Sequence, residues 1–146
     1  MKLSKVVSLL MLTLLFLATG FSAQAENAKE FGEHIVYFNA FPTDSLPPQM
    51  TKQYGLKRSK NYAMINISVM EKGAGVPTGV RSKVTGSMKN LMAQSQVLEF
   101  REIKEGKAVY YIAQVGVQSK QNVNFNIDIK PEGSDEKYEI KFSKQF

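Results

Sequence analysis

Apolar and polar side chains alternate at every second position over most of the chain beyond residue 32, which is the period of a β-strand with one buried face. The pattern is clearest in residues 123–130, where valine, phenylalanine and isoleucine share one face and asparagines and an aspartate occupy the other. We predict seven strands on this basis, at residues 33–41, 62–71, 80–89, 96–104, 108–118, 123–130 and 138–146. Turn residues separate them, with a tight hairpin at Glu105-Gly106 and a looser turn over 131–135.

One segment has helical signals instead. Residues 45–55 offer Ser45 as an N-cap, a proline in the first turn and Gly55 just past the end, which predicts about two turns of helix. A second short helical turn is expected at residues 90–94. Strands with so little helix predict an all-β domain of two antiparallel sheets packed face to face, an Ig-like sandwich. A small closed barrel is the alternative that the pattern leaves open.

The first 25 residues have the features of a signal peptide. Lys2 and Lys5 precede an apolar run over residues 6–19, and Ala23-Gln24-Ala25 supplies the small residues that signal peptidase requires. We predict cleavage after Ala25 and a single domain over residues 26–146. An uncleaved anchor is the alternative, but the apolar run is short for a membrane span of about 20 residues. Export places the domain in the periplasm or outside the cell.

The amino-acid composition limits both the chemistry that this chain can perform and the partners that it is expected to bind. The chain contains no cysteine, so disulfides, thiolate metal sites and cysteine nucleophiles are excluded. Its formal net charge is +6, and the basic residues concentrate in the middle, where residues 50–90 hold eight lysines and arginines against the single acid Glu71. That asymmetry favours an anionic partner. In an exported protein we expect an envelope protein or an anionic envelope component rather than nucleic acid.

The candidate binding site lies in this basic stretch. One group of cations precedes the second predicted strand, and the other begins the third. If those strands are hairpin partners, the two groups approach each other near one sheet edge. The five candidate residues are Lys57, Arg58, Lys60, Arg81 and Lys83.

Two structural explanations compete with a binding role. Lysines on an exposed strand protect a sheet edge from pairing with other molecules. The guanidinium of Arg58 could instead hold the corner between helix and strand by donating to backbone carbonyls.

The sequence gives little support for a catalytic or metal-binding role. His34 is the single histidine, no G-x-S-x-G motif occurs, and Glu99 and Glu102 should point to opposite faces of one strand. We therefore expect no catalytic residues and no cofactor, with a small envelope hydrolase as an alternative. Thioethers suit Cu(I), which makes a copper-binding protein a second alternative, although the methionines are dispersed. Those in the predicted domain are Met50, Met64, Met70, Met88 and Met92.

Several short motifs resemble the DUF4426 family of small exported proteins from Gram-negative gammaproteobacteria. The most specific are Tyr54-Gly55 followed by Arg58-Ser59-Lys60, the run from Leu98 to Arg101-Glu102, and Ala108 with Tyr110-Tyr111. The resemblance spans essentially all of residues 26–146 and implies an exported, compact, all-β domain. The family's function is unknown, so the resemblance supplies no catalytic residues.

Together these observations predict a periplasmic domain that acts by binding rather than by catalysis. The basic residues named above are its predicted contact surface, and a protein or an anionic envelope component is its predicted partner.

Overall fold

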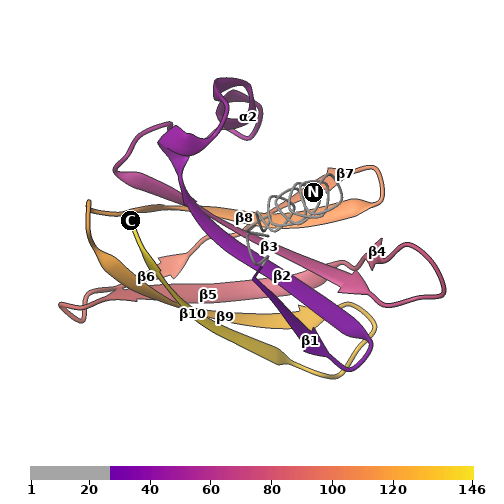
Figure 1. The fold of residues 1–146 in the computed structure, drawn as a ribbon. Coiled ribbons are helices and arrows are strands. Elements are labelled where there is room, and N and C mark those ends of the chain that lie inside the picture. Colours follow the sequence, from indigo (N-terminus) through magenta and orange to yellow (C-terminus); the bar gives the residue numbers. More distant parts are fainter. Residues whose placement is uncertain (1–26) are drawn as a thin grey trace, which may run out of the picture.

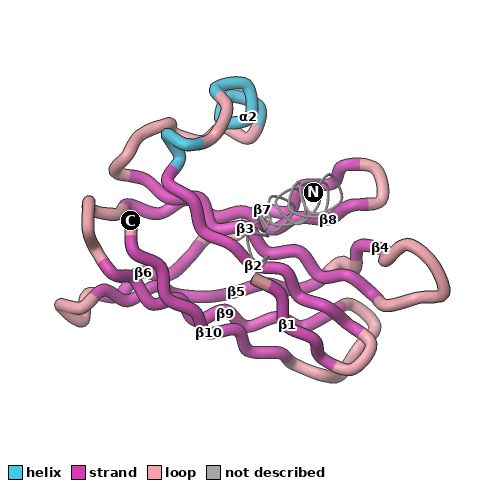
Figure 2. The backbone as a smooth tube through the Cα atoms, viewed as in Figure 1, coloured by secondary structure: helices cyan, strands magenta, loops and turns pink. Residues whose placement is uncertain are grey.

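The computed structural model describes residues 27–146, which form two antiparallel β-sheets packed face to face (Figure 1). The predicted all-β sandwich is confirmed. Strands dominate and helix is confined to one short region (Figure 2). The predicted signal peptide lies outside the described residues. Within residues 27–146, no helix has the length and apolar character needed to cross a membrane.

The first sheet has the strand order β1-β2-β3-β8-β7, and the short β4 pairs with β3 beside this path. All pairings are antiparallel. Its strands are β1 (Ala28–Phe31), β2 (His34–Pro42), β3 (Tyr62–Glu71), β4 (Thr78–Gly79), β7 (Arg101–Glu105) and β8 (Ala108–Gly116).

The second sheet has the order β10-β9-β5-β6. Its strands are β5 (Ser82–Asn90), β6 (Ser95–Leu98), β9 (Asn122–Pro131) and β10 (Tyr138–Gln145). Strand β6 is short and pairs only with residues 86–89 of β5, so the first half of β5 forms part of the sheet edge. The central strands of this sheet are β9 and β5.

The apolar phase of each long strand faces the space between the sheets, as the alternation predicted. In β9 the four apolar residues from Val123 to Ile129 are at most 2% exposed, and in β3 the four from Ala63 to Val69 are fully buried. Partly buried aromatic side chains such as Phe38 extend this core. Burial of these side chains is the main stabilising contribution to the sandwich.

The predicted strand at residues 96–104 is wrong, because it is two strands in different sheets. Strand β6 ends at Leu98, which is buried in the core, and β7 begins at Arg101 in the other sheet. Phe100 packs against the core between them. Both halves alternate between apolar and polar residues, so the pattern alone does not reveal the change of sheet. Strand β1 was not predicted, since its four residues are mostly exposed and lack the alternation.

The helical region covers the outer face of the first sheet. It comprises the 3₁₀ turn η2 (Thr43–Ser45) and the helix α2 (Pro48–Gln53), with Gly55 at φ +61 just beyond. Pro47, not Ser45, occupies the N-cap position of α2. A second small apolar cluster of Leu56, Met64 and Ile112 lies beneath this region.

Residues 90–94 form a turn rather than the expected helical turn. The Asn90 side-chain oxygen accepts hydrogen bonds from the backbone N–H groups of Met92 and Gln94, at 3.1 and 2.9 Å. Asparagine offers the backbone these bonds in place of a helix, which explains the difference.

Candidate functional site

The structure separates the five predicted cations into two groups at opposite ends of the sandwich. Strands β3 and β5 lie in different sheets and are not hairpin partners. The start of β3 at Tyr62 lies beside the end of β5 at Asn90, where both line one cavity. Arg81 and Lys83 therefore lie a full strand length away from Lys57, Arg58 and Lys60, and the five residues do not form one surface.

The group that precedes β3 holds the polypeptide corner together. Arg58 donates from Nε to the Leu46 carbonyl at 3.2 Å and from a terminal nitrogen to the Asp44 carbonyl at 2.6 Å. The buried Thr43 hydroxyl lies 2.8 Å from the carbonyl oxygen of Lys57 and also contacts Ser59. This is the structural alternative that the sequence suggested for Arg58, and it is confirmed.

Lys57 and Lys60 contribute less to that corner. The Lys57 ammonium lies over the Tyr62 ring, 4.9 Å from its centroid, in a cation–π contact. Lys60 is exposed.

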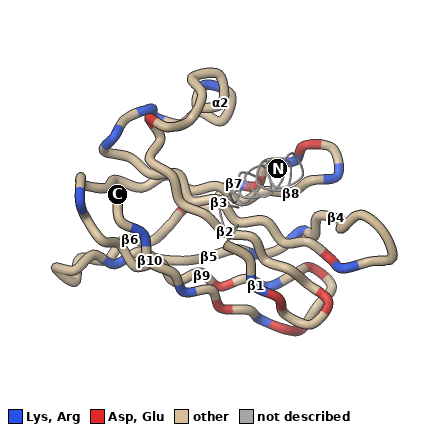
Figure 3. The backbone as a smooth tube through the Cα atoms, in the orientation of Figure 1, with Lys and Arg blue, Asp and Glu red and all other residues tan. Residues whose placement is uncertain are grey.

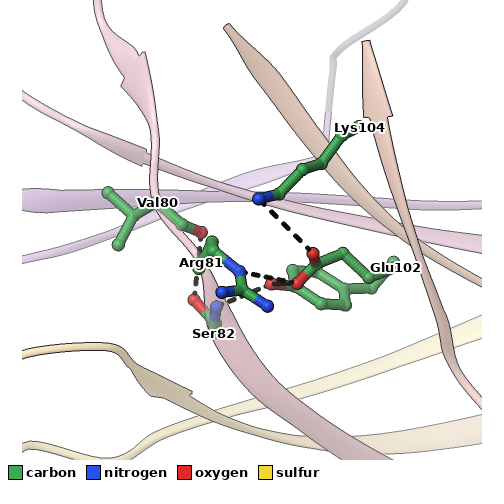
Figure 4. Close-up of polar contacts among 6 residues, drawn as sticks. Val80, Arg81, Ser82, Glu102 and Lys104 are labelled. Carbon is green, nitrogen blue, oxygen red and sulfur yellow. Dashed lines mark hydrogen bonds and ion pairs between the residues drawn. The ribbon is translucent and has the colours of Figure 1, made fainter.

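Arg81 belongs to a junction that ties the two sheets together at their open edge (Figure 4). Its Nε donates to Glu102 Oε2 at 3.2 Å, and the Tyr111 hydroxyl donates to the same oxygen at 3.0 Å. The Ser82 N–H in turn donates to the Tyr111 hydroxyl oxygen at 2.6 Å. The bond from Arg81 holds the pKa of Glu102 below its ordinary value, and burial raises the pKa of Tyr111. Arg81 is therefore paired within the fold, on a carboxylate that it shares with Lys104.

Lys83 is different, because its neighbours across the sheet are also lysines. The register of β5 and β9 places it directly opposite Lys130. Tyr138 pairs with Ile129, so Lys137, one residue before, continues the line on the other side of Lys130. The neighbouring residues Val84, Ile129 and Tyr138 point inward, which puts the lysines on the outer face of the second sheet. We call Lys83, Lys130 and Lys137 the lysine row.

The lysine row lines a surface cavity of about 610 Å³ together with Thr85 and one acid, Asp128. Among residues 27–146, no ion pair involves any of its three members. A second cavity of about 540 Å³ shares Lys83 and Lys130 but has acidic residues around it from β7 and the β9–β10 turn. Basic and acidic positions are interspersed around that turn (Figure 3). Of these two cavities, the one over the lysine row therefore has the more positive lining.

Edge protection accounts for only part of the lysine row. Lys83 lies in the half of β5 that has no β6 partner, where a lysine would discourage pairing with another strand. Lys130, in contrast, lies on β9, which has a neighbour on each side. Sequence reasoning missed Lys130 and Lys137 because their proximity to Lys83 depends on strand order. The available signal was the outward phase of Lys130 in the strand predicted at 123–130, whereas Lys137 lies just before the strand predicted at 138–146.

The single histidine contacts a tyrosine. His34 is partly buried, and its Nδ1 lies 2.8 Å from the hydroxyl of Tyr138. The same hydroxyl lies 3.0 Å from Glu136 Oε2, so Tyr138 contacts both side chains. The bond links β2 to β10 across the sheets.

Acidic residues do not cluster with His34 into a metal site. In the described part of the chain, no three histidine, aspartate or glutamate side chains gather in a geometry suited to a metal ion. Glu99 lies between β6 and β7, whereas Glu102 belongs to the junction with Arg81.

The methionines are partly brought together. Met50 of α2 and Met64 of β3 line a common cavity on the outer face of the first sheet. Met88 is in the main core, and Met92 is exposed in the β5–β6 turn. His34 pairs with Glu71 at the far end of β3, so the described residues place no imidazole beside the two thioethers.

These features define a two-sheet antiparallel β-sandwich with a basic row on one outer face and a helix-covered cavity on the other. The chain belongs to the DUF4426 family, described as a domain of unknown function, whose profile matches residues 28–146. The resemblance seen in the sequence motifs is thereby confirmed. No curated protein matches the chain.

Solved structures share the fold. A crystal structure of a DUF4426 family protein from Pseudomonas aeruginosa PAO1 has 33% sequence identity and a TM-score of 0.71, covering 85% of this chain and 96% of that one. FetP of uropathogenic Escherichia coli strain F11, recombinantly expressed in the periplasm, has 10% identity and a TM-score of 0.60, covering 87% and 97%. A copper-bound variant of FetP has 11% identity and a TM-score of 0.58, covering 84% and 95%. At such identities, the FetP structures indicate a common fold.

Proposed function

We propose that this protein is a periplasmic, non-enzymatic binding domain that recognises an anionic envelope component through the lysine row. The features of residues 1–25 support export and removal of a signal peptide after Ala25, which leaves residues 26–146 as one domain. Of the five predicted cations, the proposal retains Lys83 and adds Lys130 and Lys137. It assigns Arg58 and Arg81 to the stability of the fold.

The observation that carries the proposal is that Lys83 and Lys130 face each other on adjacent strands and that Lys137, just before β10, lines the same cavity. Like charges directly opposite each other destabilise a sheet, so the fold bears a cost that an anion would relieve. Neighbouring strands lie about 4.8 Å apart, so the side chains of Lys83 and Lys130 start from closely spaced positions, with Lys137 beside them in the same cavity. That spacing suits a ligand with several phosphate or carboxylate groups close together. Lysine near an anionic lipid surface contributes about 1 kcal/mol.

The test compares two charge-reversal variants of the protein comprising residues 26–146. The first is Lys83→Glu, Lys130→Glu and Lys137→Glu. The control is Lys60→Glu, Lys107→Glu and Lys120→Glu, which has the same net charge but leaves the lysine row intact. Binding is measured by co-sedimentation with phosphatidylglycerol–phosphatidylcholine vesicles and by calorimetry with purified lipopolysaccharide.

We expect the wild type and the control to bind one of these probes at low salt and the first variant to lose at least tenfold in affinity. Binding should weaken as salt rises, because the contact is between charges near the surface. The proposal is wrong if both variants lose affinity equally, since net charge alone would then be responsible. It is also wrong if neither probe binds the wild type. The response to vesicles or to lipopolysaccharide distinguishes the two sources of phosphate.

A further inference from the structure

Strand β10 is the longest edge strand in the described part of the chain. It has eight residues, whereas the edge strands β1, β6 and β7 have four, four and five. Only β9 pairs with β10, so its other side has no hydrogen-bonded neighbour among residues 27–146. This edge runs along one side of the sandwich, next to β1 of the other sheet (Figure 1). A long open edge is a surface on which another strand can pair.

The backbone of β10 presents a regular set of donors and acceptors on that edge. The Phe146 N–H donates to the Gln121 carbonyl oxygen at 3.1 Å, in the register that continues the pairing of β9 and β10. Because bonded positions alternate in an antiparallel pair, the even-numbered residues of β10 bond β9. The odd-numbered residues Glu139, Lys141 and Ser143 therefore direct their N–H and C=O groups to the open edge.

Residues 138–143 lack the features that usually block a sheet edge. Native proteins protect open edges with a proline, a bulge or a charged side chain on the inner face. This stretch contains no proline, its pairing with β9 is uninterrupted, and its inner positions are Tyr138, Ile140 and Phe142. Tyr138 and Ile140 are buried, whereas Phe142 is only partly covered. The edge is therefore regular and apolar on its inner side, which suits continuation of the sheet.

The outer face of this stretch carries one charge of each sign, and the two charges define a self-complementary register. Glu139 Oε2 lies 3.0 Å from Lys141 Nζ, and the two side chains are 49% and 66% exposed. If a second β10 pairs antiparallel about Ile140, each Glu139 faces Lys141 of the other copy. Pairing centred on Lys141 or on Glu139 instead would oppose two like charges, which destabilises a sheet. Charge complementarity therefore favours a second copy of this chain, in one register.

We propose that the protein forms a homodimer in which two β10 strands pair antiparallel about Ile140. The two four-stranded sheets then become one sheet of eight strands. Glu139 of one copy and Lys141 of the other exchange backbone hydrogen bonds, and each carboxylate lies between two ammonium groups. On the inner side, Tyr138 faces Phe142 of the other copy and adds to its cover. The charges that set this register are not in the lysine row, so the inference is independent of the proposed function.

Exchange of the two charges tests the proposal on the protein of residues 26–146. Sedimentation equilibrium measures self-association of the wild type, Glu139→Lys, Lys141→Glu and the double variant E139K/K141E. We expect each single reversal to weaken the dimer at least tenfold, because it opposes like charges, and the double exchange to restore the wild-type affinity. The single reversals change net charge in opposite directions, so a general effect of net charge cannot weaken both. Lys107→Glu, in the turn between β7 and β8, is the control and should dimerise like the wild type.

Two single-cysteine variants test the register, since the chain has no cysteine of its own. Glu139→Cys and Lys141→Cys proteins are oxidised with diamide, each alone and as an equal mixture. A disulfide-linked dimer should form in the mixture, where the two thiols face each other and the second Glu139–Lys141 pair is kept. Neither variant alone should cross-link, because its two thiols are not opposite each other.

Three outcomes would overturn the proposal. A wild type that stays monomeric up to about 1 mM would show that no specific pairing of β10 occurs. Self-association that neither single reversal weakens would place the contact on another surface. Cross-linking of Lys141→Cys alone, with none in the mixture, would contradict the register about Ile140. Circular dichroism of each variant shows that a loss of association is not a loss of the fold.

Discussion

Lys83 and Lys130 lie directly opposite each other on β5 and β9, and Lys137 continues the line beyond Lys130. An isolated sheet would be more stable with opposite charges or neutral polar groups at these facing positions. The arrangement therefore separates two explanations of surface lysines. Protection of an edge requires one cation on an unpaired strand, whereas binding of an anion requires several cations close together.

Replacing one member of the facing pair should stabilise the fold while removing its affinity for anions. We expect Lys130→Glu to raise the free energy of unfolding by about 0.2–1 kcal/mol, because it converts a repulsive pair into an attractive one. Lys89→Glu is the matched control, since Lys89 faces Asn124 and relieves no repulsion. Its effect should stay within about 0.5 kcal/mol. Urea unfolding measures both, and a less stable Lys130→Glu would contradict the prediction.

Loss of the Arg58 side chain should loosen the corner before β3. Arg58→Ala removes two charge-assisted hydrogen bonds to the carbonyls of Asp44 and Leu46. Since the group is exposed, we expect a loss of roughly 1 kcal/mol in unfolding free energy. Arg58→Lys should recover little of this, because an ammonium lacks the planar fork that reaches both carbonyls. Lys60→Ala serves as the control, and an equal loss there would argue against a specific role for Arg58.

The junction between Arg81 and Glu102 should make stability depend on pH in the acid range. The pKa of Glu102 is lowered from its ordinary value of 4.5, first by the hydrogen bond from Arg81. A carboxyl group whose pKa is lower in the folded than in the unfolded protein contributes stability at any pH above its unfolded pKa. That contribution disappears as the pH falls through the folded pKa. Wild type should therefore exceed Glu102→Gln in stability at pH 7, and the difference should shrink below pH 4.5. Urea midpoints between pH 7 and pH 2.5 test this, and a constant difference would refute it.

Gly86 should tolerate no side chain. A Cβ there would lie 2.7 Å from the Asn126 carbonyl oxygen and 2.7 Å from Ile127 Cδ1. Gly86→Ala forces the central strands β5 and β9 apart, so we expect a loss of about 1–3 kcal/mol. Gly116→Ala is the control, because a Cβ there meets no atom within 4 Å and the backbone conformation is ordinary. Comparable effects of the two substitutions in urea unfolding would show that crowding at Gly86 is unimportant.

The sequence predicts the strands of this fold better than their arrangement. In β3 and β9, one face is apolar at every second position, so both the strand and its buried side chains can be read directly from the chain. The segment 96–104 has the same alternation but crosses from one sheet to the other after Leu98. The alternation of apolar and polar residues does not reveal that change, because both sheets bury the same kind of side chain.

The expected meeting of the five cations at one sheet edge is wrong, because it depended on strand order. The residues before β3 and those that begin β5 are near in sequence but lie at opposite ends of the sandwich. Lys83 and Lys130 are far apart in sequence but adjacent across the sheet. The role of Arg58 could be predicted from the sequence, because a corner between helix and strand leaves backbone carbonyls that need hydrogen-bond donors.

The change of sheet between β6 and β7 also shapes how the domain can fold. Each sheet combines an early and a late part of the chain: β7 and β8 complete the sheet begun by β1–β3, and β9 and β10 complete the one begun by β5. Neither half of the polypeptide contains a finished sheet. Such non-local pairing gives a high contact order, for which folding takes milliseconds to seconds. Before residue 122, only the β5–β6 hairpin of the second sheet is available to cover the apolar face of β3 and β8, so a shortened chain should aggregate rather than form a smaller domain.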